Sequence, residues 1–141
     1  MVIKNDGSVW ATGCNKFGQL GSRSTTDWLV YVQVISLGTK SVAAGRQHSM
    51  ILKRDGSVWA TGQNKYGQLG DSSRTNRKVF TKVVSDNAKA IAAGSSHSMV
   101  LKQDGSVWAT GSNEDGQLGD DITMSTYFVR LAPFCNGLRY D

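Results

Sequence analysis

Two histidines, several carboxylates and one glycine-rich segment are the residues of this chain that could do chemistry. His48 and His97 are its only histidines, and neither has a cysteine or carboxylate at a spacing that metal ligation uses. The glycine-rich stretch 62–70 lacks the Gly-Lys-Ser/Thr of a phosphate-binding loop. An acidic group could hold a cation but matches no calcium-loop pattern: Glu114, Asp115, Asp120 and Asp121. We therefore predict no catalytic residue, no metal, no cofactor and no enzyme activity.

A repeat accounts for many of these residues. The octet Asp-Gly-Ser-Val-Trp-Ala-Thr-Gly begins at Asp6, Asp55 and Asp104, each 49 positions after the last, and Gly-Gln-Leu-Gly follows each copy. A fixed period of this length indicates one structural unit copied in tandem, and no insertion is expected to break it. Because His48 and His97 share one position of the repeat, we predict that they tie neighbouring backbone segments together.

Each copy is predicted to form strands, because its apolar residues come in short runs bounded by glycine and polar residues. Asp55-Gly56 lies between two such runs, which predicts a hairpin with a two-residue turn and positive φ at Gly56, and likewise at Gly105. Further strands are expected at 30–34, 41–45, 79–83 and 128–132. The total is about four strands in each repeat of about fifty residues.

Four short antiparallel strands per repeat predict an all-β fold built of β-propeller blades, here a partial propeller of about three blades. We treat residues 1–141 as a single repeat array with copies at about 1–40, 41–89 and 90–141. The repeat tryptophans are large enough to fill the space between blades. We expect Trp59 and Trp108 to be largely buried there, and Trp10, near an unpartnered end, to be more exposed.

The string from His97 to Trp108, followed by Gly111, Asn113 and Gly-Gln-Leu-Gly at 116–119, resembles the repeat of the regulator of chromosome condensation family. That family builds seven-bladed propellers, which would need about 343 residues at this period. The chain has 141, so both of its ends fall inside a blade. Three readings stay open: part of a longer propeller, an arc covered by partner subunits, or a ring closed by copies of the chain.

The net charge of +5 is uneven along the chain. Residues 46–89 carry nine basic and three acidic side chains, whereas residues 90–141 carry three basic and six acidic ones. The basic middle copy could attract nucleic acid or an acidic protein, but its charges are interspersed, which favours solvated loop positions. Cys14 and Cys135 lie outside the repeat pattern, which argues against a disulfide framework.

The sequence contains no apolar run long enough to cross a membrane and no signal-peptide pattern. We expect a cytoplasmic or nuclear protein if Met1 is the true start. No membrane insertion is predicted.

Positions that differ between copies are the candidates for partner contacts, because those that agree maintain the fold. Trp28 is the one tryptophan outside the repeat, at a position where the other copies have Arg77 and Thr126. The predicted contact residues are Phe17, Trp28, Tyr31, Lys65, Tyr66, Arg74, Arg77 and Lys78.

The resemblance implies three classes of function. Nucleotide exchange on a small GTPase, with nucleosome binding, requires a full propeller and a wedge between strands, and ultraviolet sensing requires tryptophans that stretches 45–49 and 94–98 lack. A non-catalytic protein-interaction scaffold or structural subunit is therefore the predicted function. The alternative is a fragment of a guanine-nucleotide exchange factor or chromatin-binding regulator. The expected partner is a protein or the remaining blades of a propeller, with nucleic acid the less favoured choice.

Overall fold

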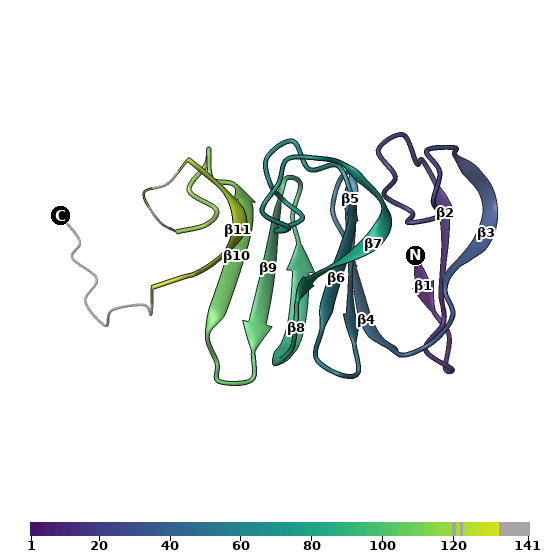
Figure 1. Cartoon of the computed structure of the whole chain (residues 1–141), viewed down its shortest axis with the longest axis horizontal. Coiled ribbons are helices and arrows are strands. Elements are labelled where there is room, and N and C mark those ends of the chain that lie inside the picture. Colours follow the sequence, from purple (N-terminus) through teal and green to yellow (C-terminus); the bar gives the residue numbers. More distant parts are fainter. Residues whose placement is uncertain (120, 122, 133–141) are drawn as a thin grey trace.

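The computed structural model describes residues 1–119, 121 and 123–132, and its regular elements in this part are all β-strands (Figure 1). Eleven strands form three antiparallel sheets that stand side by side as blades. Blade 1 contains β1 (Val2–Ile3), β2 (Val9–Gly13) and β3 (Trp28–Ile35). Blade 2 contains β4 (Thr39–Ala44), β5 (His48–Lys53), β6 (Val58–Gly62) and β7 (Arg77–Val84). Blade 3 contains β8 (Ala88–Ala93), β9 (His97–Lys102), β10 (Val107–Ser112) and β11 (Met124–Arg130).

Within each blade the strands follow one another as a meander, in the orders β1-β2-β3, β4-β5-β6-β7 and β8-β9-β10-β11. Blades 2 and 3 have the predicted four strands, and blade 1 has three. The predicted fold, a partial propeller of antiparallel blades, is therefore confirmed.

The hairpin between β5 and β6 differs from the predicted two-residue turn. Gly56 N donates to Lys53 O (3.1 Å) and Lys53 N donates to Ser57 O (2.9 Å), so three residues form the loop. This pattern is a four-residue turn from Lys53 to Gly56, whose last residue is a left-handed glycine that forms a bulge. Gly56 has the expected positive φ of 82°, and Gly105 one of 83°. Asp55 favours the longer loop, because its carboxylate accepts hydrogen bonds from Ser57 N (2.9 Å) and Ser57 Oγ (2.6 Å).

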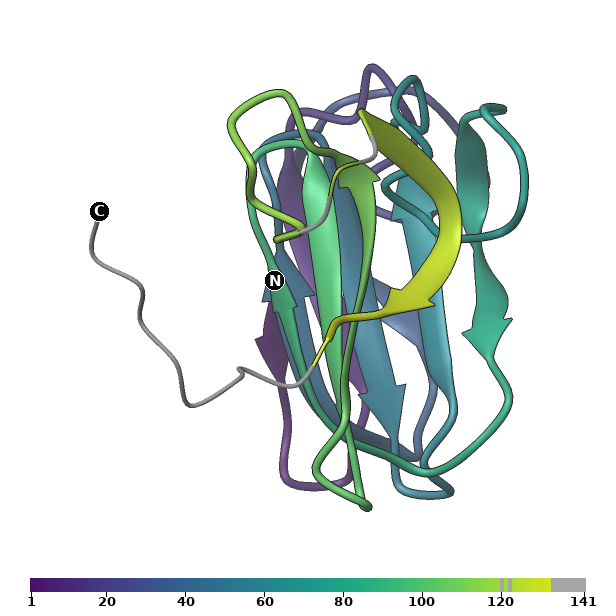
Figure 2. The same cartoon turned by 90° about the vertical axis from the view of Figure 1, so that its left-hand side faces the viewer.

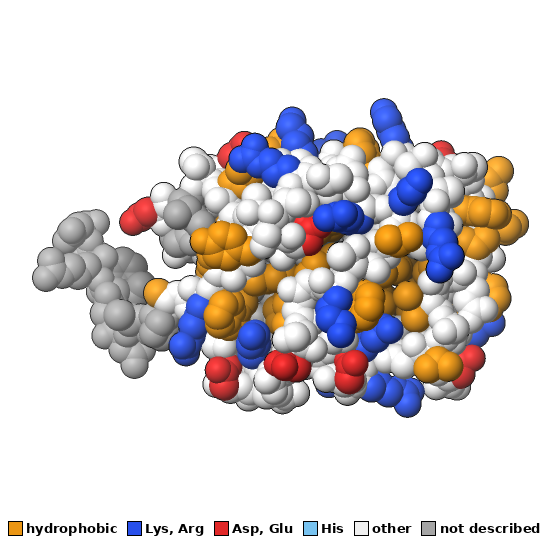
Figure 3. Space-filling view, in the orientation of Figure 1, with side chains coloured by type: hydrophobic (Ala, Val, Ile, Leu, Met, Phe, Trp, Pro, Cys, Tyr) orange, Lys and Arg blue, Asp and Glu red, His pale blue; other side chains and the backbone are white. Residues whose placement is uncertain are grey.

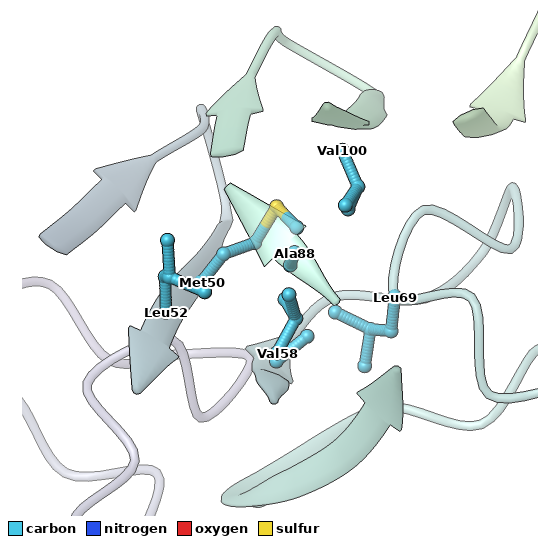
Figure 4. Packing of buried hydrophobic residues seen from close by; sticks show 7 residues of the cluster. Met50, Leu52, Val58, Leu69, Ala88 and Val100 are labelled. Atoms are coloured by element: carbon cyan, nitrogen blue, oxygen red, sulfur yellow. The ribbon is translucent and has the colours of Figure 1, made fainter. Parts of the chain in front are cut away.

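The main hydrophobic core lies between blades 2 and 3 (Figure 4). Alternation along the strands directs one set of side chains from β5 and β6 towards β8 and β9. Its fully or almost fully buried members are Met50, Leu52, Val58, Ala60, Leu69, Ala88 and Val100. These residues come from blades 2 and 3, six from strands and Leu69 from a loop, so the core belongs to the contact between blades.

The repeated asparagine shapes the loop that carries Gly-Gln-Leu-Gly. Asn64 is fully buried, and its Oδ1 accepts a hydrogen bond from Leu69 N (3.0 Å). Its Nδ2 donates to Asp71 Oδ1 (2.9 Å) and to Ser73 O (3.0 Å). Asn15 and Asn113 accept the corresponding bond from a leucine N–H in blades 1 and 3. One buried amide therefore organises the same loop in all three blades.

The outermost strand of each blade bulges at the same place. Between the pairs Ala60↔Thr81 and Gly62↔Arg77, three residues of β7 lie opposite one residue of β6. In blade 3 the corresponding pair is Gly111↔Ser125, which is 48 rather than 49 residues beyond Arg77 on the outer strand. The expectation of an unbroken period is therefore wrong. The third copy is one residue shorter in this loop, and Arg77 corresponds to Ser125 rather than Thr126.

The shorter loop also moves the last strand. β11 begins at Met124 and ends at Arg130, whereas we predicted 128–132. The error arose because a bulged edge lacks the strict alternation on which strand prediction depends.

Candidate interaction surfaces

Threonines of the octet link neighbouring blades. Thr61 Oγ1 lies within hydrogen-bonding distance of Gly18 O in blade 1 (2.9 Å) and of Arg77 O in its own blade (2.8 Å). Thr110 has the same relation to Gly67 O (2.9 Å) and Ser125 O (2.9 Å). The hydroxyl thus fills the bulge of its own outer strand and contacts the preceding blade.

His48 forms a second link, between blades 2 and 3. Ser98 Oγ donates to Gln68 O (2.6 Å), so the 2.9 Å contact between His48 Nε2 and Ser98 Oγ requires the Nε2–H tautomer. The ring is 1% exposed, and its Nδ1 is buried without a hydrogen-bond partner. Burial, with a smaller contribution from the charge of His97, lowers the pKa of His48 to about 4. A neutral imidazole therefore joins the two blades.

Glycine and aromatic residues make the third link. A Cβ placed on Gly21 would lie 2.5 Å from the ring of Phe80, and one on Gly70 would lie 2.5 Å from the ring of Phe128. Each aromatic residue is the third of the three bulge residues and packs on the glycine of the preceding blade. The equivalent glycine of blade 3, Gly119, has no atom of the described residues within 4 Å of the same position. Within the described residues, the link is therefore complete at both junctions and open after blade 3.

The C-terminal end face, which Figure 2 views from the front, consists of Met99, Leu101, Val107, Gly116 and Gly119. The first three are half-buried, although their counterparts Met50, Leu52 and Val58 in blade 2 are fully buried. His97, also in blade 3, is half-buried and contacts no serine of a following blade among the described residues. This end therefore carries the residues of a blade junction, but among the described residues no following blade covers them.

The N-terminal end face consists of Val2, Leu29 and Tyr31. Tyr31 occupies the bulge position of Phe80 and Phe128, but it is 53% exposed, because no glycine of a preceding blade covers it among the described residues. Leu29 is 96% exposed and Val2 is 42% exposed. At each blade junction a bulge residue packs on a glycine of the preceding blade. The C-terminal end face presents the glycine side of this contact, and the N-terminal end face presents the bulge side.

The structure separates the predicted contact residues into several places. Phe17, Lys65 and Tyr66 lie in the Gly-Gln-Leu-Gly loops, and Lys65 Nζ is 5.2 Å from the centroid of the Tyr66 ring. Arg77 Nε pairs with Asp71 Oδ2 at 2.7 Å, so the charge of Arg77 is balanced by an ion pair within the chain. Trp28, Tyr31, Arg74 and Lys78 are exposed.

Basic side chains do not gather into one patch on the face shown in Figure 3, where lysine and arginine are scattered among apolar and acidic ones. The sequence predicts exposed positions and two apolar end faces, but it cannot show which glycines the following blade covers.

The burial expected for the tryptophans is wrong. Trp10, Trp59 and Trp108 are all half-buried. The Trp59 indole N–H donates to Ser57 Oγ (3.0 Å), and Lys53 Nζ and Lys82 Nζ lie 4.6 and 5.3 Å from its ring centroid. An indole has a polar edge and attracts cations to its face, so lysines rather than another blade cover much of it.

Other sequence expectations concern cysteines, metals and membranes. Cys14 is exposed and not in a disulfide, and Cys135 lies outside the described residues, as does Asp120 of the acidic group. No group of three potential metal ligands occurs in residues 1–119, 121 and 123–132. The same part of the chain has no helix that is long and apolar enough to cross a membrane.

Comparison with solved structures finds proteins with the same fold, among them yeast RCC1. Human WBSCR16 is 24% identical over 93% of this chain, with a TM-score of 0.83. Yeast RCC1 (Prp20) bound to Kap60 is 23% identical over 95% of it, with a TM-score of 0.82. Prp20p of Saccharomyces cerevisiae, described with its binding properties to Gsp1p and histones, is 24% identical over 95%, with a TM-score of 0.80. The chain spans only about a third of each protein, namely 36%, 35% and 36%.

Comparison of sequences gives the family. No curated protein matches the chain significantly. One profile of the regulator of chromosome condensation (RCC1) repeat matches residues 6–52 and 55–101, and a second matches residues 39–68 and 88–117. Together with the three blades, these matches show that the chain belongs to the RCC1 repeat family.

Proposed function

We propose that the chain is a non-catalytic scaffold that binds proteins, including further blades of the same repeat, through its two end faces. The observation that carries this proposal is the contrast between equivalent glycines. Gly18, Gly21, Gly67 and Gly70 are covered by the outer strand of the following blade, whereas Gly116 and Gly119 face open space among the described residues.

The exposed apolar side chains support the same function. Leu29 and Tyr31 stand together on β3 with Trp28 and Val30, which are 36% and 65% exposed. A run of this kind on a soluble protein marks a site of association. The names of the yeast RCC1 structures mention protein partners, Kap60, Gsp1p and histones, which adds support for a protein ligand.

Light scattering after size exclusion tests the proposal. We expect the purified chain to exceed its monomer mass of 15.2 kDa in a concentration-dependent manner. Because the end faces are apolar, association should persist between about 0.15 M and about 0.5 M salt. A monodisperse monomer under both conditions would contradict the use of the end faces. Binding to nucleic acid that falls steeply with salt would instead favour the basic middle copy.

A fragment of a guanine-nucleotide exchange factor or chromatin-binding regulator is the second candidate. The likeness to yeast RCC1 favours it, since that protein is described with Gsp1p and histones. A nucleotide-release assay with a small nuclear GTPase separates the two candidates. The scaffold proposal expects no acceleration, and faster release would replace it with the second candidate.

A further inference from the structure

A pocket of about 300 Å³ lies between blades 2 and 3, at the Gly-Gln-Leu-Gly loops. Tyr66 of blade 2 forms one wall, and the other walls belong to blade 3. Its lining includes Tyr66, Ser95, Ser96, Ser112, Glu114 and Asp115. The backbone of one wall is held in place, because Ser112 N donates to Ser96 O (2.9 Å).

Small side chains make this pocket. The positions of Ser95, Ser96 and Ser112 are occupied one repeat earlier, at the junction of blades 1 and 2, by Arg46, Gln47 and Gln63. The amide of Gln63 extends to Gln68, whose Nε2 donates to Gln63 Oε1 (3.3 Å). Serine cannot reach as far as glutamine or arginine, so these three serines leave room for the pocket at the second junction.

The charge at the pocket also reverses between the two junctions. Glu114 and Asp115 occupy the positions of Lys65 and Tyr66 in the preceding copy. Both acidic residues are exposed, and within the described residues neither carboxylate pairs with a cation. Their backbones are fixed, since Asp115 N donates to Gln117 Oε1 (2.8 Å) and Glu114 N to Ser112 Oγ (3.4 Å).

We propose that this pocket binds an arginine side chain of a partner protein. A guanidinium is planar, so it can stack on the ring of Tyr66 while it forms paired hydrogen bonds with a carboxylate of Glu114 or Asp115. The serine hydroxyls offer further acceptors in the same space. Lys65, whose ammonium lies near the Tyr66 ring, opposes the incoming charge and thereby limits the affinity. The site lies between two blades that are both present and does not rest on the end faces.

Titration with short peptides tests the proposal on the full chain. The probes are acetyl-Gly-Arg-Gly-amide, its lysine counterpart and its citrulline counterpart, which has the shape of arginine without the charge. Backbone ¹H–¹⁵N resonances of Tyr66, Ser96 and Glu114 should shift with the arginine peptide. We expect binding about tenfold weaker for citrulline and about threefold weaker for lysine. Equal binding of arginine and citrulline, or shifts spread over all acidic surfaces, would overturn the proposal.

Variants sharpen the assignment. Glu114→Gln and Asp115→Asn should each weaken the arginine peptide by about threefold to tenfold, whereas Lys65→Gln should strengthen it by about twofold. The double variant Ser96→Gln/Ser112→Gln should abolish binding, because the two longer side chains, which blade 2 carries at these positions, would fill the pocket. Asp86→Asn, an exposed acid elsewhere, is the matched control and should leave binding unchanged. Unchanged binding in the double glutamine variant, with a folded spectrum, would exclude the pocket.

Discussion

Strands β5 and β9 have nearly the same sequence, His-Ser-Met-Ile-Leu-Lys and His-Ser-Met-Val-Leu-Lys, but different surroundings. The first five residues of β5 are buried, whereas in β9 only Ser98 and Val100 are. Blade 3 packs against one face of β5, and Ser49 and Ile51 on its other face are buried as well, whereas among the described residues β9 has a neighbouring blade on one face only. In a stacked repeat, burial is therefore set by the neighbouring blade as much as by the residue itself.

The largest test of this comparison uses the matched leucines. Leu52 is fully buried in the core between blades 2 and 3, and Leu101 is the same residue on the C-terminal end face. Leu52→Ala should lower the free energy of unfolding by about 2 to 5 kcal/mol, whereas Leu101→Ala should cost about half as much or less. Urea unfolding of both variants, at a concentration where light scattering gives the monomer mass, measures the difference. Equal losses in the monomer would contradict the exposure of Leu101 on the end face.

The matched glycines test the open junction in a second way. Gly70 and Gly119 have φ of 74° and 67°, so alanine is strained at both by about 1 to 2 kcal/mol. At Gly70 the added Cβ also meets the ring of Phe128, which should raise the loss to about 2 to 4 kcal/mol. Thermal and urea unfolding of Gly70→Ala and Gly119→Ala give the comparison. A larger loss at Gly119 than at Gly70 would break it.

The histidine link predicts a dependence of stability on pH. Because burial lowers the pKa of His48 from 6.5 to about 4, the folded protein binds fewer protons than the unfolded chain between these values. The free energy of unfolding should therefore fall as the pH drops from about 6.5 to about 4, by about 3 kcal/mol in total. Unfolding curves across this range should show the slope in the wild type and in His97→Gln, and lack it in His48→Gln. A slope retained in His48→Gln would assign it to other groups.

The smallest expected effect concerns the serine that His48 contacts. Ser98→Ala leaves His48 Nε2 and Gln68 O without their partner, and should cost about 1 to 2 kcal/mol. Ser49 is its equivalent in blade 2, and no histidine of a preceding blade faces it in the described part of the chain. Ser49→Ala should therefore cost less, as measured by denaturant unfolding. The reverse order would show that the serines act within their own blade.

The sequence predicts the parts of the fold that every copy repeats. The octet marks the second hairpin of the blade, and the glycine after Asp55 has positive φ as expected. The strand predicted at 79–83 lies within β7, and the one predicted at 41–45 overlaps β4, which ends one residue earlier at Ala44. These features depend on local backbone preference and on the alternation of apolar residues, which are written in consecutive positions.

Features that depend on neighbouring blades could not be predicted in this way. The half-exposure of Trp59 follows from lysines on two other strands, and the loop shortened in the third copy has no motif that fixes its length. In the sequence, the pocket beside Tyr66 appears only as three serines at positions where the preceding copy has longer side chains. The sequence cannot show that these serines and Tyr66 line one pocket, because that depends on how blades 2 and 3 pack.

The hydrogen bonds at the start of each blade have a consequence for how such chains grow. Thr39 N donates to Gly7 O (3.1 Å), and Ala88 N donates to Gly56 O (3.0 Å), one repeat later. Both bonds join backbone atoms at equivalent places, so the connection does not depend on which side chains the two blades carry. A gene duplication that adds one whole repeat therefore supplies both halves of every new connection, and blades can be gained, lost or exchanged while their loops diverge.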